Sequence, residues 1–389
     1  GYYLIFAMTS KHRKGTAAGS MDHILKLCKA DRVTEAMDHC RKLTFASFNW
    51  VMADREGDIG YQLGGLYPKR PAGTSGLLPY MGWDRKQDWN GMVDPGQIPR
   101  SCNPEEGFIA TANQDLNHLG EVKVMTLPMS RYRAEWISTL LRQGTRLTVE
   151  DMKRMHYDRY SLQAKAFMEI IHPLLPHSEN GDILREWDLR YEADSPGATL
   201  FERIHHELLT LVFFDHDPGS GGIDYLLEET PVFAMAHGNF DDVLLSESSA
   251  WFDEKPREEW YKEAIERGLK GKAIRHGTAR KIYIENLFFG GKLPGCLGFD
   301  YPLEHIGSCS TIPQAQLFTL NGRPSTFAAT LRLICDFADE TLHANVAGGA
   351  SDRRFSRYYK AGLREWENGD YDSLTPKSDD GVNDTERIQ

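Results

Sequence analysis

The sequence predicts an α+β fold in which antiparallel strands at both ends of the chain flank a mainly helical middle. Apolar and polar residues alternate over 47–54 and 58–64 around Arg55-Glu56-Gly57, which is typical of a β-hairpin. Apolar residues then recur at helical spacing through 132–212, and strand-like patterns return after residue 306. With 389 residues, 41% of them hydrophobic, the chain can bury a sizeable core.

The first part of the chain is expected to be rich in sheet. Residues 2–8 are apolar and aromatic, as in a buried strand, and the basic, glycine-rich stretch 10–20 predicts a loop. Residues 21–30 and 33–43 show the apolar spacing of two helices that precede the hairpin. Prolines and glycines then mark a long loop over 68–79. A loop of this length usually serves a function or docks on a partner.

The middle of the chain predicts helices. One should cover 132–141, and Thr148 should begin the next, with Asp151 as its reciprocal partner in a capping box. Residues 281–289 suit either a strand or a helix. Further helices are expected up to 175 and over 183–189, 198–212 and 258–269.

Near its end the chain returns to strand patterns before a closing helix. The strands are expected over 307–312, 327–337 and 341–346, and the helix over 355–366. The predicted organisation is a sheet-rich part at 1–127, a mainly helical segment at 128–300, a C-terminal sheet with its closing helix at 301–376, and a polar tail at 377–389.

Charge and cysteine content exclude some classes of function. A net charge of −11 argues against a nucleic-acid partner, because phosphates need a basic surface. The apolar runs are too short for a membrane span. None of the six cysteines has a zinc-like spacing, and Cys28 and Cys335 are expected to be buried thiols. His205 and His206 are adjacent on a helix and diverge, so they do not suggest a shared metal.

Asn113 is the candidate for chemistry. Phe108 and Ile109 suit a strand that runs out among small residues before Asn113. An asparagine amide offers N–H donors without charge, which is what a developing oxyanion needs. Asparagine also ends strands by bonding its own backbone. Local chemistry leaves both roles open.

An ordered series of motifs resembles the penicillin acylase family, a branch of the N-terminal-nucleophile hydrolases. The series includes Phe48-Asn49-Trp50-Val51-Met52-Ala53-Asp54, Gly57-Asp58-Ile59-Gly60-Tyr61, Gly82-Trp83-Asp84 and Gly107-Phe108-Ile109-Ala110. The resemblance spans 1–374, is strong at 47–113 and 306–374, and is thin at 213–300. It implies a four-layer αββα core, two antiparallel sheets between helices, with a helical insertion and with part of the core missing from this chain.

The resemblance also implies roles for three residues. Asn113 would donate to the oxyanion of a tetrahedral intermediate, and Gln114 stands where many members have a second asparagine. Arg133 precedes an Ile-x-x-Leu-Leu helix, where the family has an arginine that holds the nucleophile's amine and the asparagine in place. The plain alternative for Arg133 is an exposed helix arginine, and Arg131 is an equal rival on composition. Phe48 would line the apolar acyl pocket, and the plain alternative is a core aromatic on a strand.

The family's nucleophile is expected to lie outside this sequence. In the family it is a serine at the new N-terminus of the large chain, with its own α-amine as base, whose pKa is near ~8. Gly1 heads the sequence and has no side chain to attack with. The expectation is therefore the C-terminal part of a β chain, which would be inactive in isolation. Its partners would be the missing upstream segment and the α chain of the same precursor.

The implied activity is hydrolysis of a linear amide of an acylated amine, such as a β-lactam side chain or an N-acyl homoserine lactone. An inactive acylase-fold binding protein and a truncated fragment are the alternatives. No cofactor is expected. A structural calcium occurs in the family, but its main carboxylates would lie upstream, so no metal is placed here. Members are commonly exported to the periplasm or secreted, and the compartment of this chain stays open.

Overall fold

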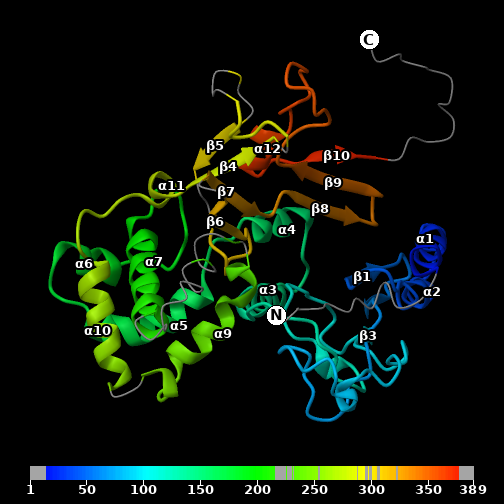
Figure 1. Cartoon of the computed structure of the whole chain (residues 1–389). Helices are drawn as coiled ribbons and strands as arrows, with labels where there is room; N and C mark the ends of the chain where they lie inside the picture. The colour runs from blue at the N-terminus through cyan, green and yellow to red at the C-terminus, as the bar shows by residue number, and fades with distance from the viewer. Residues whose placement is uncertain are drawn as a thin grey trace. The chain divides into compact units, whose positions relative to one another are not determined.

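The computed structural model describes residues 15–375 except 215–224, 226–229, 231, 253–254, 287, 294–296, 298–299, 305–306 and 321–322. The chain forms two compact units, Gly1–Ala134 and Glu135–Gln389, which are described separately (Figure 1). The strand expected at 2–8 lies outside the described residues.

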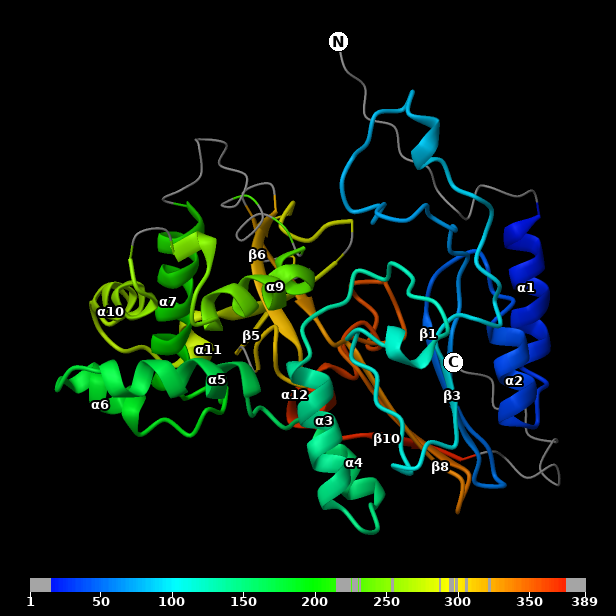
Figure 2. The ribbon, with the colours of Figure 1, turned by 90° about the horizontal axis from the view of Figure 1, so that it is seen from below.

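The first unit is built on a small antiparallel sheet with two helices beside it (Figure 2). The sheet has the order β1-β2-β3, and the predicted hairpin is confirmed, with Val51 paired to Tyr61. Helix α2 packs directly on β2. The two approach so closely at Gly60 that a Cβ added there would lie 2.5 Å from Val33 Cγ1. The elements are α1 (Thr16–Leu27), α2 (Val33–Cys40), β1 (Asn49–Ala53), β2 (Ile59–Leu63), η2 (Arg85–Gln87), β3 (Arg100–Cys102) and η3 (Asn117–Leu119).

Helix α3 (Tyr132–Gln143) begins in the first unit and continues into the second. The second unit opens with helices, and the capping box of α4 is confirmed, since Thr148 and Asp151 exchange hydrogen bonds. Its described helices are α4 (Val149–His156), α5 (Leu162–Ile171), η4 (His172–Leu174), α6 (Glu179–Arg185), α7 (Pro196–Leu209), η5 (Thr210–Phe214), α9 (Phe233–Leu245), η6 (Ala250–Phe252), α10 (Arg257–Gly268), α11 (His276–Ala279) and α12 (Leu363–Asn368).

The largest core of the second unit lies among α5, α7 and α10, which gather in one group (Figure 1). Helices α7 and α10 approach so closely that a Cβ on Gly268 would lie 2.8 Å from the backbone of Ile204. Within this core the buried Asp241 carboxylate accepts a hydrogen bond from Gln163 at 2.7 Å and contacts His205 Nε2 at 2.8 Å. The buried Asp241 carboxyl group therefore has polar partners at both of its oxygens, as buried polar groups require.

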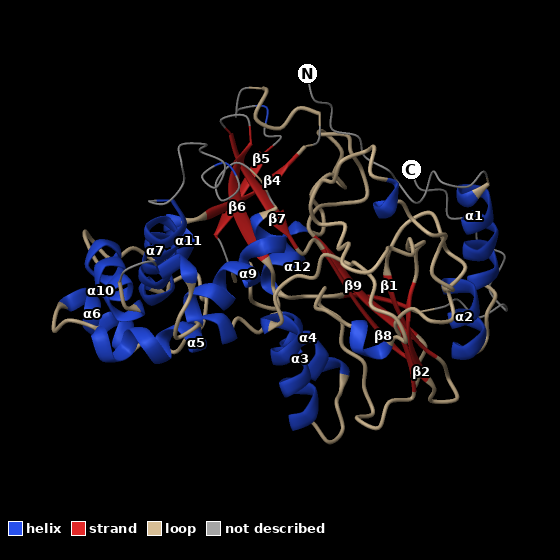
Figure 3. Ribbon diagram, turned by 60° about the horizontal axis from the view of Figure 1, so that its bottom comes forward, coloured by secondary structure: helices blue, strands red, loops and turns tan. Residues whose placement is uncertain are grey.

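The described strands of the second unit pair antiparallel and are drawn in red in Figure 3. All of them come after α11 in the sequence, and α12 lies between β9 and β10. They form the ladders β10-β9-β8, β4-β5 and β6-β7. The predicted α+β class with antiparallel sheets and a helical middle is confirmed, and the sheets are short ladders of two or three strands. The strands are β4 (Lys281–Glu285), β5 (Asp300–Glu304), β6 (Ala315–Leu320), β7 (Arg323–Ala328), β8 (Leu331–Asp336), β9 (Thr341–Val346) and β10 (Asp372–Leu374).

Several local expectations were wrong. Helix α1 begins at Thr16 rather than within 21–30, and the closing helix begins only at Leu363. Residues 307–312 form a turn, in which the Thr311 hydroxyl accepts the Ser308 N–H at 2.7 Å, in place of a strand. Cys28 and Cys335 are exposed, because Cys28 lies at the C-terminal end of α1 and Cys335 lies on the exposed face of β8. Among the described helices, none has both the length and the apolar character needed to span a bilayer.

A polar cluster joins α4 to the C-terminal sheet of the second unit. The Tyr157 hydroxyl accepts hydrogen bonds from Arg332 at 3.0 Å and Asn345 at 2.9 Å, and donates to the Trp366 carbonyl at 2.5 Å. The Arg332 guanidinium lies 4.3 Å above the Tyr157 ring. Next to it, His156 Nδ1 lies 2.6 Å from the Tyr371 hydroxyl. Burial, and secondarily the Arg332 charge, lower the pKa of His156 to about 4.

The His156 environment predicts a pH-dependent stability. Between the folded pKa of about 4 and an unfolded pKa near ~6.5, the unfolded chain binds more protons, so stability rises with pH in this window. This effect can raise the free energy of unfolding by at most about 3 kcal/mol across the window, and we expect His156→Gln to abolish that rise. Urea unfolding across the pH window measures it, and exposed His177→Gln is the control. An unchanged slope in the His156 variant would contradict the assignment.

Candidate functional site

The segment that leads to Asn113 is held in place by hydrogen bonds from a side chain and not by pairing with a strand. The strand expected at 108–109 is wrong, since β3 ends at Cys102 and residues 108–112 join no ladder. Gln114 replaces a neighbouring strand: its Nε2 donates to the Ala110 carbonyl at 3.0 Å, and its Oε1 accepts the Ala112 N–H at 2.7 Å. The approach to Asn113 is thus fixed by its own neighbour.

Asn113 itself has a left-handed backbone, with φ of 68°. Asparagine tolerates this region better than other residues with a Cβ, because its short polar side chain bonds locally. The Asn113 carbonyl accepts the Met129 N–H at 2.7 Å, which ties the turn to the segment before α3. The side chain of Asn113 is exposed.

Arg133 holds the Asn113 amide in one orientation. Its guanidinium is buried, with 8% of the residue exposed, and Nη2 donates to the Ala112 carbonyl at 2.8 Å and to Asn113 Oδ1 at 3.1 Å. A guanidinium has no acceptor, so the amide atom that faces it is the oxygen. The two N–H donors of Asn113 are therefore turned away from Arg133 and are presented at the exposed side.

The structure separates Arg133 from the two alternatives considered on sequence. Arg133 is not an exposed helix residue, and Arg131, at the start of the same turn, is exposed. The hydrogen bonds to the Asn113 turn come from Arg133, which lies 20 positions away in the sequence. Met129 adds a contact that the sequence did not suggest, since its sulfur lies 3.5 Å from Arg133 Nη2.

Phe48 precedes β1 and is not a core residue, because 59% of it is exposed. Its ring meets Trp50 edge-on, with centroids 6.3 Å apart. The Phe48 carbonyl accepts the Gly64 N–H at 2.8 Å, which fixes the entry to the hairpin. The structure thus brings Asn113 and Arg133 into one hydrogen-bonded pair and places Phe48 on the exposed surface of the same unit.

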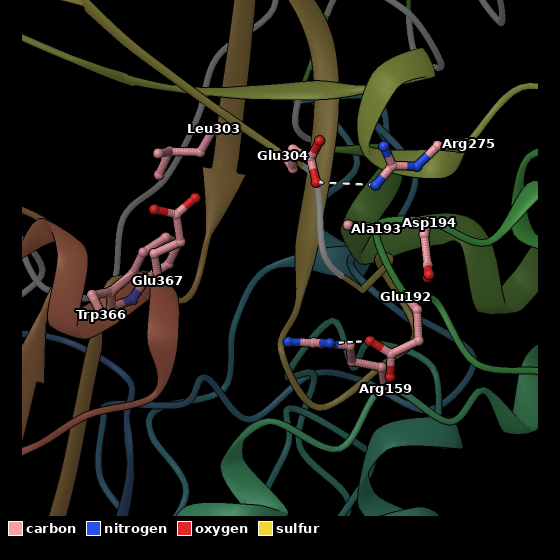
Figure 4. A pocket seen from close by; sticks show the side chains of 9 residues that line it. All are labelled: Arg159, Glu192, Ala193, Asp194, Arg275, Leu303, Glu304, Trp366 and Glu367. Atoms are coloured by element: carbon pink, nitrogen blue, oxygen red, sulfur yellow. Dashed lines mark hydrogen bonds and ion pairs between the residues drawn. The ribbon is translucent and has the colours of Figure 1, made fainter.

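The second unit contains a charged hollow of about 280 Å³ (Figure 4). Two ion pairs line it, Arg159 with Glu192 and, at 3.8 Å, Arg275 with Glu304. Trp366 and Glu367 from α12 form another side. Its lining contains no serine, threonine, cysteine, lysine or histidine, and two of its four carboxylates are engaged in the ion pairs, so we assign it no catalytic role.

A metal ion has no candidate ligand set in the part of the chain that the structure describes. Within it, no group of three or more His, Cys, Asp or Glu side chains is arranged to hold one.

Comparison with known proteins gives one family and several relatives. The family model described as penicillin amidase matches residues 4–380. The acyl-homoserine lactone acylase QuiP of Pseudomonas putida is 28% identical, over 91% of this chain and 47% of that protein. The penicillin acylase 2 proenzyme of Pseudomonas sp. strain SE83 is 29% identical over 50% of this chain and 26% of its own length. The chain spans about half the length of the curated relatives that match along most of it.

A solved structure shares the fold. A thermostable penicillin G acylase from Alcaligenes faecalis aligns with a TM-score of 0.66, covering 93% of this chain and 70% of that chain. Sequence identity to it is 18%, so this likeness speaks to the fold alone.

The Asn113–Arg133 geometry predicts unequal effects for two neighbouring arginines. We expect Arg133→Met to lower the free energy of unfolding by about 2 kcal/mol, because the buried Ala112 carbonyl loses its charged donor. Hydrogen exchange at the Met129 amide should speed up as the Asn113 turn loosens. Arg131→Met is the matched control, with a change within about 0.5 kcal/mol. Equal losses in both variants would refute the assigned contact.

Proposed function

We propose, since this chain belongs to the penicillin amidase family, that it is part of the β subunit of an amidohydrolase. The reaction is hydrolysis of a linear amide to a carboxylic acid and an amine. The substrate class is an acylated amine, such as a β-lactam side chain or an N-acyl homoserine lactone, in keeping with the names of its relatives. The observation that carries the proposal is the Asn113 amide held by Arg133.

The proposed mechanism is acyl transfer through a covalent intermediate. A serine from chain outside this sequence attacks the amide carbonyl, and its own α-amine takes the hydroxyl proton. The carbonyl oxygen becomes an oxyanion as the carbon becomes tetrahedral. The C–N bond of the substrate then breaks: the substrate's amine leaves with the proton taken from the hydroxyl, and the acyl group remains on the serine as an ester. A water molecule then attacks that ester, with the α-amine again as the base, and the carboxylic acid is released.

Asn113 supplies a preorganised donor in this mechanism. A donor that already points at the position of the developing charge needs no reorganisation when the reaction occurs. Arg133 is a positioning residue, because it fixes the amide oxygen and so directs the N–H donors away from itself. The left-handed turn at Asn113 brings the side chain to the exposed side of the unit, where a serine from another segment can approach.

Phe48 is proposed to line the acyl end of the substrate. Its ring is exposed, so it is available to apolar groups, and it lies within 47–113, one of the two stretches where the family resemblance is strong. An aromatic ring narrows an apolar pocket and limits the size of the acyl group that fits.

An acylase-fold binding protein without catalysis is the rival function. It would share the fold and an apolar cleft, but its gene would encode no serine behind a processing site. Reading the codons upstream of Gly1 separates the two functions.

We expect Asn113→Gly in the complete enzyme to raise the barrier by about 3 kcal/mol, the scale measured for one oxyanion donor. Glycine keeps the left-handed backbone without strain, so the change removes the amide alone. The loss should appear in kcat with KM nearly unchanged, because the donor acts mainly in the transition state.

Asn103→Gly is the matched control for this measurement. Asn103 also has a positive φ, of 48°, and its side chain bonds Asp58 and the Ile59 N–H, away from Asn113. Its kcat should stay near that of the unchanged enzyme. Normal turnover by the Asn113→Gly enzyme would show that Asn113 is not the oxyanion donor.

The role of Phe48 predicts a change in acyl preference. We expect Phe48→Ala to raise kcat/KM for long or branched acyl groups relative to short ones by about tenfold, because the pocket widens. A panel of amides with one amine and increasing acyl size measures the shift. Phe45→Ala, which removes an equally exposed phenylalanine three positions earlier, should leave the preference unchanged. A preference that moves equally in both variants would exclude Phe48 from the pocket.

A further inference from the structure

The long proline- and glycine-rich loop of the first unit forms one wall of a hollow that the proposed mechanism does not use. Residues 67–77 and 122–128 enclose a cavity of about 630 Å³, completed by Val93, Asp115 and Asn117. We call this cavity the loop pocket. Its volume falls within the range of roughly 300–1,000 Å³ that is usual for small-molecule sites.

Hydrogen bonds fix both walls of the loop pocket. On one side, Asn117 Oδ1 accepts the Val124 N–H at 2.8 Å, and its Nδ2 donates to the Val124 carbonyl at 3.0 Å. On the other, the Tyr67 carbonyl accepts the Val93 N–H at 2.8 Å, and the Lys69 N–H donates to the Gly91 carbonyl at 2.9 Å. Because the pocket is already formed, a ligand need not order it.

Apolar side chains make up much of the lining. Tyr67 and Val124 are buried in the wall, whereas Leu77 and Leu127 line the pocket with 60% and 54% of their surfaces exposed. Leu127 also has a φ of 49°, a conformation that is costly for a leucine. Large exposed apolar residues around a preformed hollow favour an apolar ligand.

Charge around the pocket favours an anionic head group. Lys69, Arg70 and Lys123 line it with Asp115 as the one acid in the lining. The Asp115 carboxylate is already engaged, since its Oδ1 accepts two N–H groups of Asn117 at 2.9 and 2.7 Å. The Arg70 guanidinium packs against Gly76, so closely that a Cβ at position 76 would overlap it. The loop thus holds a guanidinium at the pocket, and guanidinium pairs well with carboxylates.

We propose that the loop pocket binds a medium-chain aliphatic carboxylate, with its chain on the apolar lining and its carboxylate at Arg70. The choice of a carboxylate over other anions rests on the proposed function, because hydrolysis of an acylated amine releases one. One segment links the pocket wall to the candidate site, because Pro128 lines the pocket and the next residue, Met129, donates its N–H to the Asn113 carbonyl.

Calorimetric titration with decanoate, octanoate and butyrate tests the apolar part of this proposal. Affinity should rise with chain length, with decanoate at least tenfold tighter than butyrate, because each buried methylene adds to binding. Decyltrimethylammonium, with the same chain and the opposite charge, tests the head group and should bind at least about fivefold more weakly than decanoate. Absence of decanoate binding, or equal binding of the two amphiphiles, would overturn the proposal.

Two matched pairs of surface variants locate the binding. Leu77→Asp should weaken decanoate by about tenfold, whereas Leu78→Asp, one position on, exposed and outside the pocket, should not. Arg70→Gln should remove the preference for decanoate over decyltrimethylammonium, whereas Arg85→Gln, an exposed arginine paired with Asp88, should keep it. Equal effects within either pair would place the ligand elsewhere.

The titration distinguishes this proposal from the proposed function, because it requires no turnover. Decanoate binding with the expected variant pattern, in a protein whose complete form hydrolyses no amide, would overturn the function and keep the pocket. Amide hydrolysis without decanoate binding would do the reverse.

Discussion

The bond from Arg133 to Asn113 is the constraint on which the candidate site depends. A guanidinium can only donate, so its contact with Oδ1 determines which end of the amide points outward. The same nitrogen bonds the carbonyl of Ala112, so one buried charge fixes both the side chain and the backbone that carries it. The turn therefore needs no sheet partner, and Gln114 supplies the remaining hydrogen bonds.

Sequence patterns correctly predicted the elements that are stabilised by residues close together in the chain. The hairpin of β1 and β2 follows from alternation around Gly57, and the start of α4 follows from Thr148 and Asp151. Elements fixed by distant contacts were not predicted. The turn at 307–312 is tied to a distant segment, since the Gly307 N–H donates to the Tyr191 carbonyl at 3.2 Å. Strand β4 lies in a stretch whose sequence suits either a strand or a helix, and its pairing with β5 makes it a strand. Exposure of Cys335 likewise depends on which face of β8 meets the core, which periodicity alone does not give.

The candidate site residues could be predicted from the sequence only through the family resemblance, which rests on the order of several motifs. Composition could not choose between Arg131 and Arg133, since both stand at the start of α3, and burial is what separates them. No local signal pointed to Met129, which contacts Asn113 through its backbone and Arg133 through its sulfur. Gln114, a departure from the family pattern, has a structural reason to be there, because its longer side chain reaches Ala110.

Two residues with side chains adopt left-handed backbones within this short region, Asn113 and Leu127. Such conformations cost on the order of 1–3 kcal/mol each and persist only where neighbouring contacts over-determine them. Here the contacts are identifiable: Met129, two positions after Leu127, bonds the Asn113 carbonyl, and Arg133 bonds the Asn113 side chain. The backbone and the side chain of Asn113 are thus each held by a hydrogen bond from a different residue, and electrostatic catalysis requires a donor whose orientation is fixed in advance.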